Sequence, residues 1–134
     1  MVADSGFIWW EVAMLQAIAD CTLQMGRIDE TVAPATRALS LAEQVTDRQS
    51  AVFGLAHLAC VAAERGDIAR AGRLWGAIEN EEQLKPIGAW ESERDEYAGH
   101  VFAHAGPELD EALEQGRRLS LQEAVELALN RSES

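Results

Sequence analysis

The feature that most constrains this chain is its similarity to itself at an offset of 40 residues. Apolar and small residues and one glycine recur at this spacing: Leu15 matches Leu55, Ile18 matches Leu58, Ala19 matches Ala59, Gly26 matches Gly66, Ile28 matches Ile68, and Thr31 stands opposite Ala71. A helical hairpin needs large apolar side chains facing the partner helix, and a small residue where the two helices cross. It also needs a residue such as glycine to end the first helix in a left-handed turn. Such a period predicts a helical repeat array.

The repeat predicts an all-α fold, a right-handed stack of antiparallel helix hairpins with about seven helices. The expected units cover residues 7–46, 47–83 and 89–117, followed by a closing helix over 120–131. Composition agrees, because Ala (23 residues) and Leu (14 residues) lose least on entering a helix. We therefore expect residues 1–134 to form one repeat domain whose last three helices cap the array.

Local signals mark where the helices bend and end. Pro34 falls inside the second predicted helix, where it removes a backbone hydrogen bond and is expected to bend or weaken the helix. The segment Leu84–Ala89 contains Pro86 and Gly88 and predicts a loop. Ser120 and Glu123 have the spacing of a capping box, which predicts the start of the closing helix.

The sequence also indicates the cellular compartment of the protein. No stretch approaches the roughly 20 apolar residues that span a bilayer. Met1–Phe7 lacks the basic start and apolar run of a signal peptide. We therefore expect a cytoplasmic protein that does not enter a membrane. Cys21 and Cys60 both fall in apolar helical patterns, and in that compartment each is expected to be reduced and buried.

The formal net charge of −12 limits the possible partners. Binding to duplex nucleic acid requires clustered Lys and Arg, so direct contact with nucleic acid is not expected. Residues 81–134 hold 13 acids and 5 bases, and thus carry most of the excess charge. We interpret this half as a solvated helix surface, with docking to a basic partner as the alternative.

No group of residues has the pattern of an active site. His100 and His104, with Glu96 one turn earlier, place three possible metal ligands on one helix face. No further ligand is suitably spaced, so two surface histidines are the preferred interpretation. The acids around the predicted loop lack the burial that separates pKa values. No Ser or Cys has the His and acid partners of a nucleophile. We expect neither an enzyme, a bound metal nor a cofactor.

Two sets of residues are candidates for binding. In the repeat geometry, the first helices of the two units present six residues to the concave face: Gln16, Asp20, Gln24, Phe53, Cys60 and Glu64. Their mixed character fits a binding groove or a plain solvated inner surface. Trp9 and Trp10 point about 100° apart on a helix and cannot easily enter the same core. One is expected in the core, and the other under a preceding repeat outside this chain or in an exposed interaction patch.

The turns Gly26–Thr31 and Gly66–Ala71 share a glycine followed five residues later by a small residue. In this the hairpins resemble tetratricopeptide repeats, and the resemblance implies the same stacked fold. Both units lack the aromatic residue usual in the first helix, where Thr22 and Ala62 stand. The offset of 40 also exceeds the 34 residues of that family, so a standard peptide groove does not follow.

A second resemblance covers the chain from about Asp47 to Leu129. Its features are Glu64–Glu79, then Lys85-Pro86 and Glu96-Tyr97, then Gln115–Leu129. In this order they resemble the region near the C-terminus of large bacterial regulators. Those proteins join an ATPase of the signal-transduction class to a tetratricopeptide-like arm, and often carry a helix-turn-helix DNA-binding domain, sometimes of the LuxR type. This sequence shows neither that domain nor a Gly-rich phosphate-binding loop, so ATPase and DNA-binding activities are not expected of it.

The repeat and the resemblance together predict a protein-interaction or effector-sensing arm of a transcriptional regulator. Such an arm packs against a protein partner or against its own upstream ATPase domain. The alternative is a free-standing scaffold that forms a homodimer through the Trp9 and Trp10 end. A metal-binding helical protein using His100 and His104 is the weakest alternative.

Overall fold

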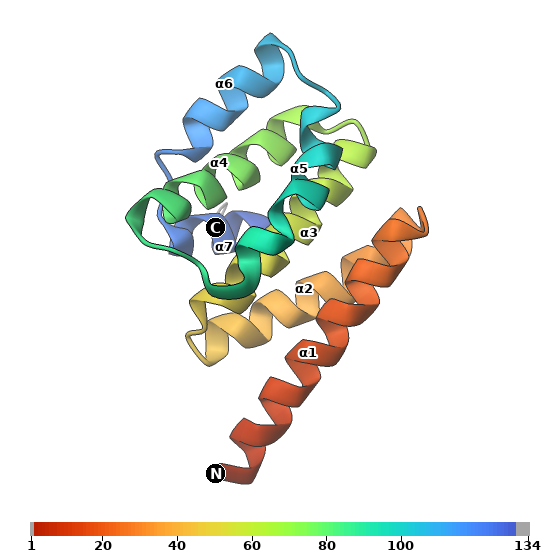
Figure 1. Ribbon diagram of the computed structural model, residues 1–134, viewed down its shortest axis with the longest axis vertical. Coiled ribbons are helices and arrows are strands. Elements are labelled where there is room, and N and C mark those ends of the chain that lie inside the picture. Colours follow the sequence, from red (N-terminus) through yellow and green to blue (C-terminus); the bar gives the residue numbers. More distant parts are fainter. Residues whose placement is uncertain (1, 131–134) are drawn as a thin grey trace.

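The computed structural model describes the backbone of residues 2–130 and the side chains of residues 7–130. Over this range the chain is all-helical, with seven α-helices and one short 3₁₀ helix (Figure 1). The elements are α1 (Val2–Gln24), α2 (Ile28–Gln44), α3 (Arg48–Glu64), α4 (Ile68–Leu84), η1 (Gly88–Ser92), α5 (Arg94–Phe102), α6 (Pro107–Gly116) and α7 (Leu121–Ala128). The prediction of an all-α fold with seven helices is confirmed. None of the described helices combines the length and apolar character needed to cross a membrane.

Helix α3 lies at the centre of the molecule and contacts α1, α2, α4, α5 and α7. Helices α1 and α2 form the first hairpin, and α3 and α4 form the second. Figure 1 shows α1 at one edge, where its N-terminal half diverges from α2. At the opposite edge α6 packs on α4, and α7 closes the stack against α2, α3 and α4.

The turns and caps follow the local sequence. Gly26 and Gly66 have φ values of 77° and 83°, the left-handed conformation predicted for both hairpin turns. At the start of α7, the Ser120 hydroxyl accepts from the Glu123 N–H at 3.0 Å, and the Glu123 carboxylate accepts from the Ser120 N–H at 2.9 Å. The predicted capping box is therefore confirmed. Helix α2 remains continuous through Pro34.

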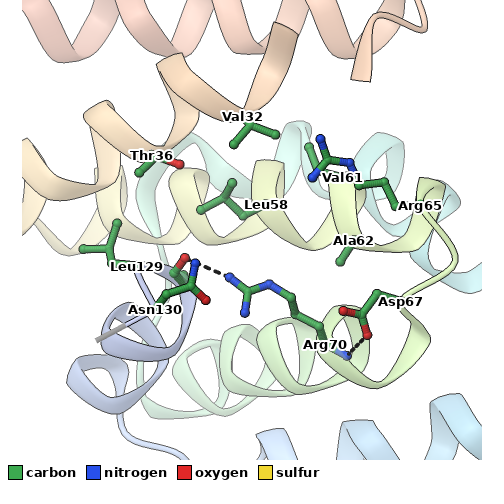
Figure 2. A pocket seen from close by; sticks show the side chains of 11 residues that line it. Val32, Thr36, Leu58, Val61, Ala62, Arg65, Asp67, Arg70, Leu129 and Asn130 are labelled. Carbon is green, nitrogen blue, oxygen red and sulfur yellow. Dashed lines mark hydrogen bonds between the residues drawn. The ribbon is translucent and has the colours of Figure 1, made fainter. Parts of the chain in front are cut away.

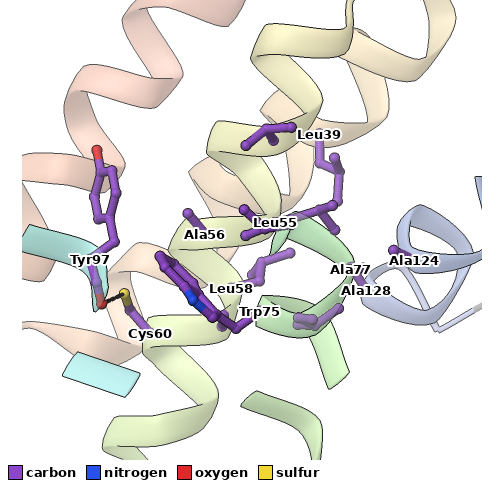
Figure 3. Packing of buried hydrophobic residues seen from close by; sticks show 14 of the residues in the cluster. Leu39, Leu55, Ala56, Leu58, Cys60, Trp75, Ala77, Tyr97, Ala124 and Ala128 are labelled. Carbon is purple, nitrogen blue, oxygen red and sulfur yellow. Dashed lines mark hydrogen bonds between the residues drawn. The ribbon is translucent and has the colours of Figure 1, made fainter. Parts of the chain in front are cut away.

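The core is built from aliphatic side chains around an aromatic cluster. Leu55 of α3, Leu74 and Trp75 of α4, and Trp90 of η1 are fully buried. The rings of Trp75 and Trp90 lie 5.9 Å apart, and Trp90 stacks on Tyr97 at 5.7 Å. Figure 3 shows Leu55 and Trp75 between α3 and α4, with Tyr97 reaching the same core from α5. The two central hairpin helices and α5 are thus fixed by one continuous core.

The loop after α4 is held by one arginine at the start of α3. Arg48 Nε lies 2.7 Å from Glu81 Oε1, and Nη2 donates to the carbonyl oxygens of Glu81 and Lys85 at 2.7 and 2.9 Å. Nη1 donates to the Pro86 carbonyl at 3.1 Å. The predicted loop before η1 is present, and these bonds satisfy the last carbonyls of α4. They also place η1 so that Trp90 enters the core.

Candidate functional site

The outer face of α1 is apolar and uncovered. Its exposed side chains, here called the outer face, are Phe7, Trp9, Trp10, Ala13, Met14, Ala17, Ile18, Cys21 and Gln24, with Met25 just after the helix. Only Gln24 among them is polar. Helix α2 covers the opposite side, where Val12, Ala19 and Leu23 are buried. Contiguous exposed apolar patches of this kind mark contact sites for proteins or membranes.

The repeat identifies what this face would ordinarily touch. Ile18 is 46 % exposed, whereas its equivalent Leu58 on α3 is 6 % exposed. Met14 corresponds to Gly54, where an added Cβ would lie 3.0 Å from Leu39 of α2. The outer face of α1 is therefore the same side that, on α3, is covered by the second helix of the preceding unit.

Two sequence predictions about this helix were wrong. Trp9 and Trp10 are 47 % and 67 % exposed, so neither enters the core as one of them was expected to do. The reason is that α1 diverges from α2 at this end and no described helix covers its other side (Figure 1). Cys21, expected to be buried, is also exposed, because it lies on the outer face with Ile18.

A small groove lies on the other flank of α1. It has a volume of about 210 Å³ and is lined by α1, α3, η1 and α5: its residues are Gln16, Ala17, Asp20, Phe53, His57, Ala89, Glu93 and Tyr97. Three of the six predicted concave-face residues, Gln16, Asp20 and Phe53, meet here. The Gln16 amide donates to the Ser50 carbonyl at 3.1 Å.

The other three predicted residues do not line this groove. Cys60 is fully buried, and its Sγ donates to the Tyr97 carbonyl at 3.4 Å. Burial, together with the nearby acids, raises the pKa of the Cys60 thiol, so it is a packing residue and not a surface ligand. Gln24 and Glu64 are exposed at the C-terminal ends of α1 and α3. The assignment of Cys60 to an accessible concave face was therefore wrong.

Asp20 is the polar centre of the groove. Its Oδ1 accepts from the Tyr97 hydroxyl at 2.6 Å and lies 2.9 Å from His57 Nε2. Burial by itself would raise the pKa of Asp20, but the bonds from His57 and Tyr97 outweigh burial and lower it. Burial and the bond to Asp20 raise the pKa of Tyr97. The carboxylate thus stays ionised and fastens α1 to α3 and α5, and a low pKa makes it a poor general acid.

Sequence reasoning missed His57 and Tyr97 as partners of Asp20. His57 is 1 % exposed, and its second ring nitrogen, Nδ1, is buried without a hydrogen-bond partner. The only signal was a histidine in an otherwise apolar inward stripe of α3. That pattern does not reveal a partner 37 residues earlier in the chain.

In the described part of the chain, His100 of α5 and His104 after the helix belong to no cluster that could hold a metal ion. His100 Nδ1 lies 2.7 Å from a carboxylate oxygen of Glu64, and His104 is exposed after the helix end. Among residues 7–130, no group of three or more His, Cys, Asp or Glu side chains is placed to hold an ion. The pair His100 and Glu64 links α5 to α3 instead.

A larger cavity of about 370 Å³ lies between α2, α3, α4 and α7 (Figure 2). The lining includes apolar residues such as Val32 and Leu58 and two charged residues, and Figure 2 shows Arg65 beside Val61 and Arg70 on α4. Arg70 Nη2 donates to the Ala128 carbonyl at 2.9 Å, and Arg65 pairs with Asp29. Both guanidinium groups are engaged within the chain, so this cavity is a gap between packed helices.

Comparisons of this chain with protein-family models, with curated proteins and with solved structures found no match.

Proposed function

We propose that the chain is a protein-interaction domain that binds a helical partner through the outer face of α1. The observation that carries this proposal is the uncovered apolar side of α1, whose counterpart on α3 is packed against a helix. Large contiguous exposed apolar patches mark sites where a protein partner binds. The flanking groove is a weaker candidate for the binding surface, because its polar centre, Asp20, is already bonded to His57 and Tyr97 inside the chain.

We further propose that this domain is the C-terminal arm of a bacterial transcriptional regulator of the signal-transduction ATPase type. This part rests on the resemblance of Glu64–Glu79 and Gln115–Leu129 to such arms. It implies a cytoplasmic location, contact with the ATPase domain of the same protein and no direct contact with nucleic acid. A free-standing homodimeric scaffold is the second candidate, and the exposure of both Trp9 and Trp10 favours it.

The coding sequence upstream of Met1 tests the arm. A nucleotide-binding ATPase encoded in the same reading frame supports it, whereas a stop codon directly before Met1 contradicts it and leaves the free-standing scaffold.

Binding tests the surface. The chain is titrated with the separately expressed ATPase module by calorimetry. A charge at Met14 should weaken binding about 100-fold, since an ionised group would enter an apolar contact. The control is Leu84→Glu, because Leu84 is 68 % exposed at the distant end of α4. Equal binding by Met14→Glu, Leu84→Glu and the unaltered chain would contradict the proposed surface.

A further inference from the structure

We infer that the outer face of α1 pairs with the same face of a second copy of this chain, with the two α1 helices antiparallel. The two-fold axis passes at the level of Gln16, so that Met14 of one copy meets Ile18 of the other. The inference rests on the proposed use of this face for interaction, and it takes a second copy, in place of the ATPase domain, as the occupant. Three properties of the face point to it.

The first property is charge. No residue of the outer face carries a charge, although the chain as a whole carries −12. Two copies repel each other over most of their surfaces, so an uncharged stripe is where they can approach. An antiparallel arrangement also places the positive end of each α1 dipole near the negative end of the other.

The second property is the distribution of side-chain size. The aromatic residues Phe7, Trp9 and Trp10 all lie in the N-terminal half of the face, and in this register Trp10 comes nearly level with the small residue Cys21 of the second copy. An antiparallel pair thus sets Trp10 against a small side chain, which close packing favours. A parallel pair would set aromatic side chains against each other and leave gaps at the small residues.

The third property is area. Aromatic side chains bury 150–250 Å² each, so the exposed fractions of Phe7 (70 %), Trp9 and Trp10 supply about 300–450 Å² of apolar surface. Met14, Ile18 and Met25 are each about half exposed or more. Together they bring the face toward the roughly 800 Å² that each partner contributes to a stable interface.

The repeat argues against the other occupant, a helix seated on α1 as α2 sits on α3. Gly54 lets Leu39 of α2 approach α3 closely. A Cβ atom added at Gly54 would lie only 3.0 Å from the Cβ of Leu39. The equivalent position on α1 is Met14, and Trp10 replaces Ser50. These larger side chains would push out a helix placed in the same way.

Sedimentation equilibrium tests the pairing. The unaltered chain should associate to a dimer as concentration rises, and Met14→Glu should weaken dimerisation about 100-fold. Circular dichroism checks that Met14→Glu keeps its helical fold, which its half-exposed position allows. Leu84→Glu should dimerise like the unaltered chain.

Disulfide formation tests the orientation. In a Cys21→Ser background, Met14→Cys and Ile18→Cys are prepared as separate chains and oxidised alone and mixed. Antiparallel pairing in this register brings position 14 within disulfide range of position 18 of the partner, and not of position 14. Only the mixture should therefore crosslink. Crosslinking of Met14→Cys alone would show a parallel pair and overturn the arrangement.

The outcomes separate this inference from the proposed function. A chain that stays monomeric at every concentration overturns the inference, as does a dimer that Met14→Glu leaves unchanged. If the monomer still binds the ATPase module through Met14, the proposed function survives. If the dimer forms as described and the ATPase module does not bind, the pairing stands and the regulator arm fails.

Discussion

At one end of the helical stack, α6 lies on α4 at backbone distance, whereas at the other end α1 leaves its outer face in solvent (Figure 1). The closed end uses glycine and alanine. A methyl group on Gly76 would overlap the Leu113 carbonyl, and one on Gly116 would overlap the Arg73 carbonyl. At the open end, the outer face of α1 instead exposes the large side chains of Trp10 and Met14.

The two ends of the stack differ in what covers the outer side of the last helix. Every helix hairpin of a stack has a side that must be covered by its neighbour. The closed end meets this need within the chain, through residues small enough for two helices to touch. The open end has large apolar side chains instead, which only become stabilising when another helix arrives. Interaction is therefore expected at α1, and rigidity at α4 and α6.

The largest expected difference in stability is between variants at Leu58 and Ile18, two positions that the repeat makes equivalent. Leu58→Ala should destabilise the chain by about 2–3 kcal/mol, because a buried side chain leaves a cavity between α3 and α2. Ile18→Ala should cost less than about 1 kcal/mol, because Ile18 is already half in solvent. Urea unfolding at a concentration too low for association measures both. Equal losses would show that α1 is as covered as α3.

The closed end is tested by its glycines. Gly76→Ala should destabilise by about 2–3 kcal/mol, since the added methyl must move α6 or α4. Gly99→Ala on α5 is the matched control, because no atom lies within 4 Å of the added Cβ. In that helix, alanine should stabilise by about 0.5–1 kcal/mol. Thermal denaturation of the two variants reads out the difference, and a neutral Gly76→Ala would mean that α4 and α6 do not touch as described.

Much of the fold could be predicted from sequence because its signals are local. The apolar spacing within each helix, the glycine turns and the Ser120 capping box each depend on neighbours within a few residues, and the structure shows the helices, the turns and the cap. Pro34 was predicted to remove one backbone bond and to bend or weaken α2; the helix is continuous through it, and the bend stays a prediction.

The site could be predicted only in part because it depends on contacts between distant segments. Asp20 and Phe53 could be placed on the concave side from repeat position. The burial of Cys60 was predicted from its apolar helical pattern, but the way α5 lies over it on α3 was not, and neither was the bond from Tyr97 to Asp20, 77 residues away. The exposure of both Trp9 and Trp10 depends on which helix covers α1, and no sequence pattern within α1 predicts which helix that is.

The inner face of α1 offers a smaller test, in which pH is the variable. Asp20→Asn should destabilise by about 1–2 kcal/mol at pH 7, since the ionised carboxylate accepts bonds from His57 and Tyr97. The pKa of Asp20 is lowered in the folded chain, so this contribution is full above the unfolded pKa of about 3.9 and is lost as pH falls through the folded value. The variant and the unaltered chain should therefore converge in acid.

Thermal denaturation from pH 7 to pH 2 follows that convergence. Asp29→Asn is the control, because Asp29 is 89 % exposed and its pair with Arg65 is solvated. A constant difference between Asp20→Asn and the unaltered chain across this range would show that the carboxylate charge does not fasten α1 to the covered part of the stack.

The smallest effect concerns the crossing within each hairpin. In the open unit the hydroxyls of Thr22 and Thr31 lie 2.8 Å apart, and in the covered unit Ala62 and Ala71 pack at the equivalent crossing. Thr31→Ala should cost about 1 kcal/mol. Because Ala at both positions reproduces the covered unit, the double variant should cost less than the two single variants added together, by about 0.5 kcal/mol or more. Strict additivity in a double-mutant cycle would mean that the two hydroxyls do not interact, and that the hairpins differ only in what covers them.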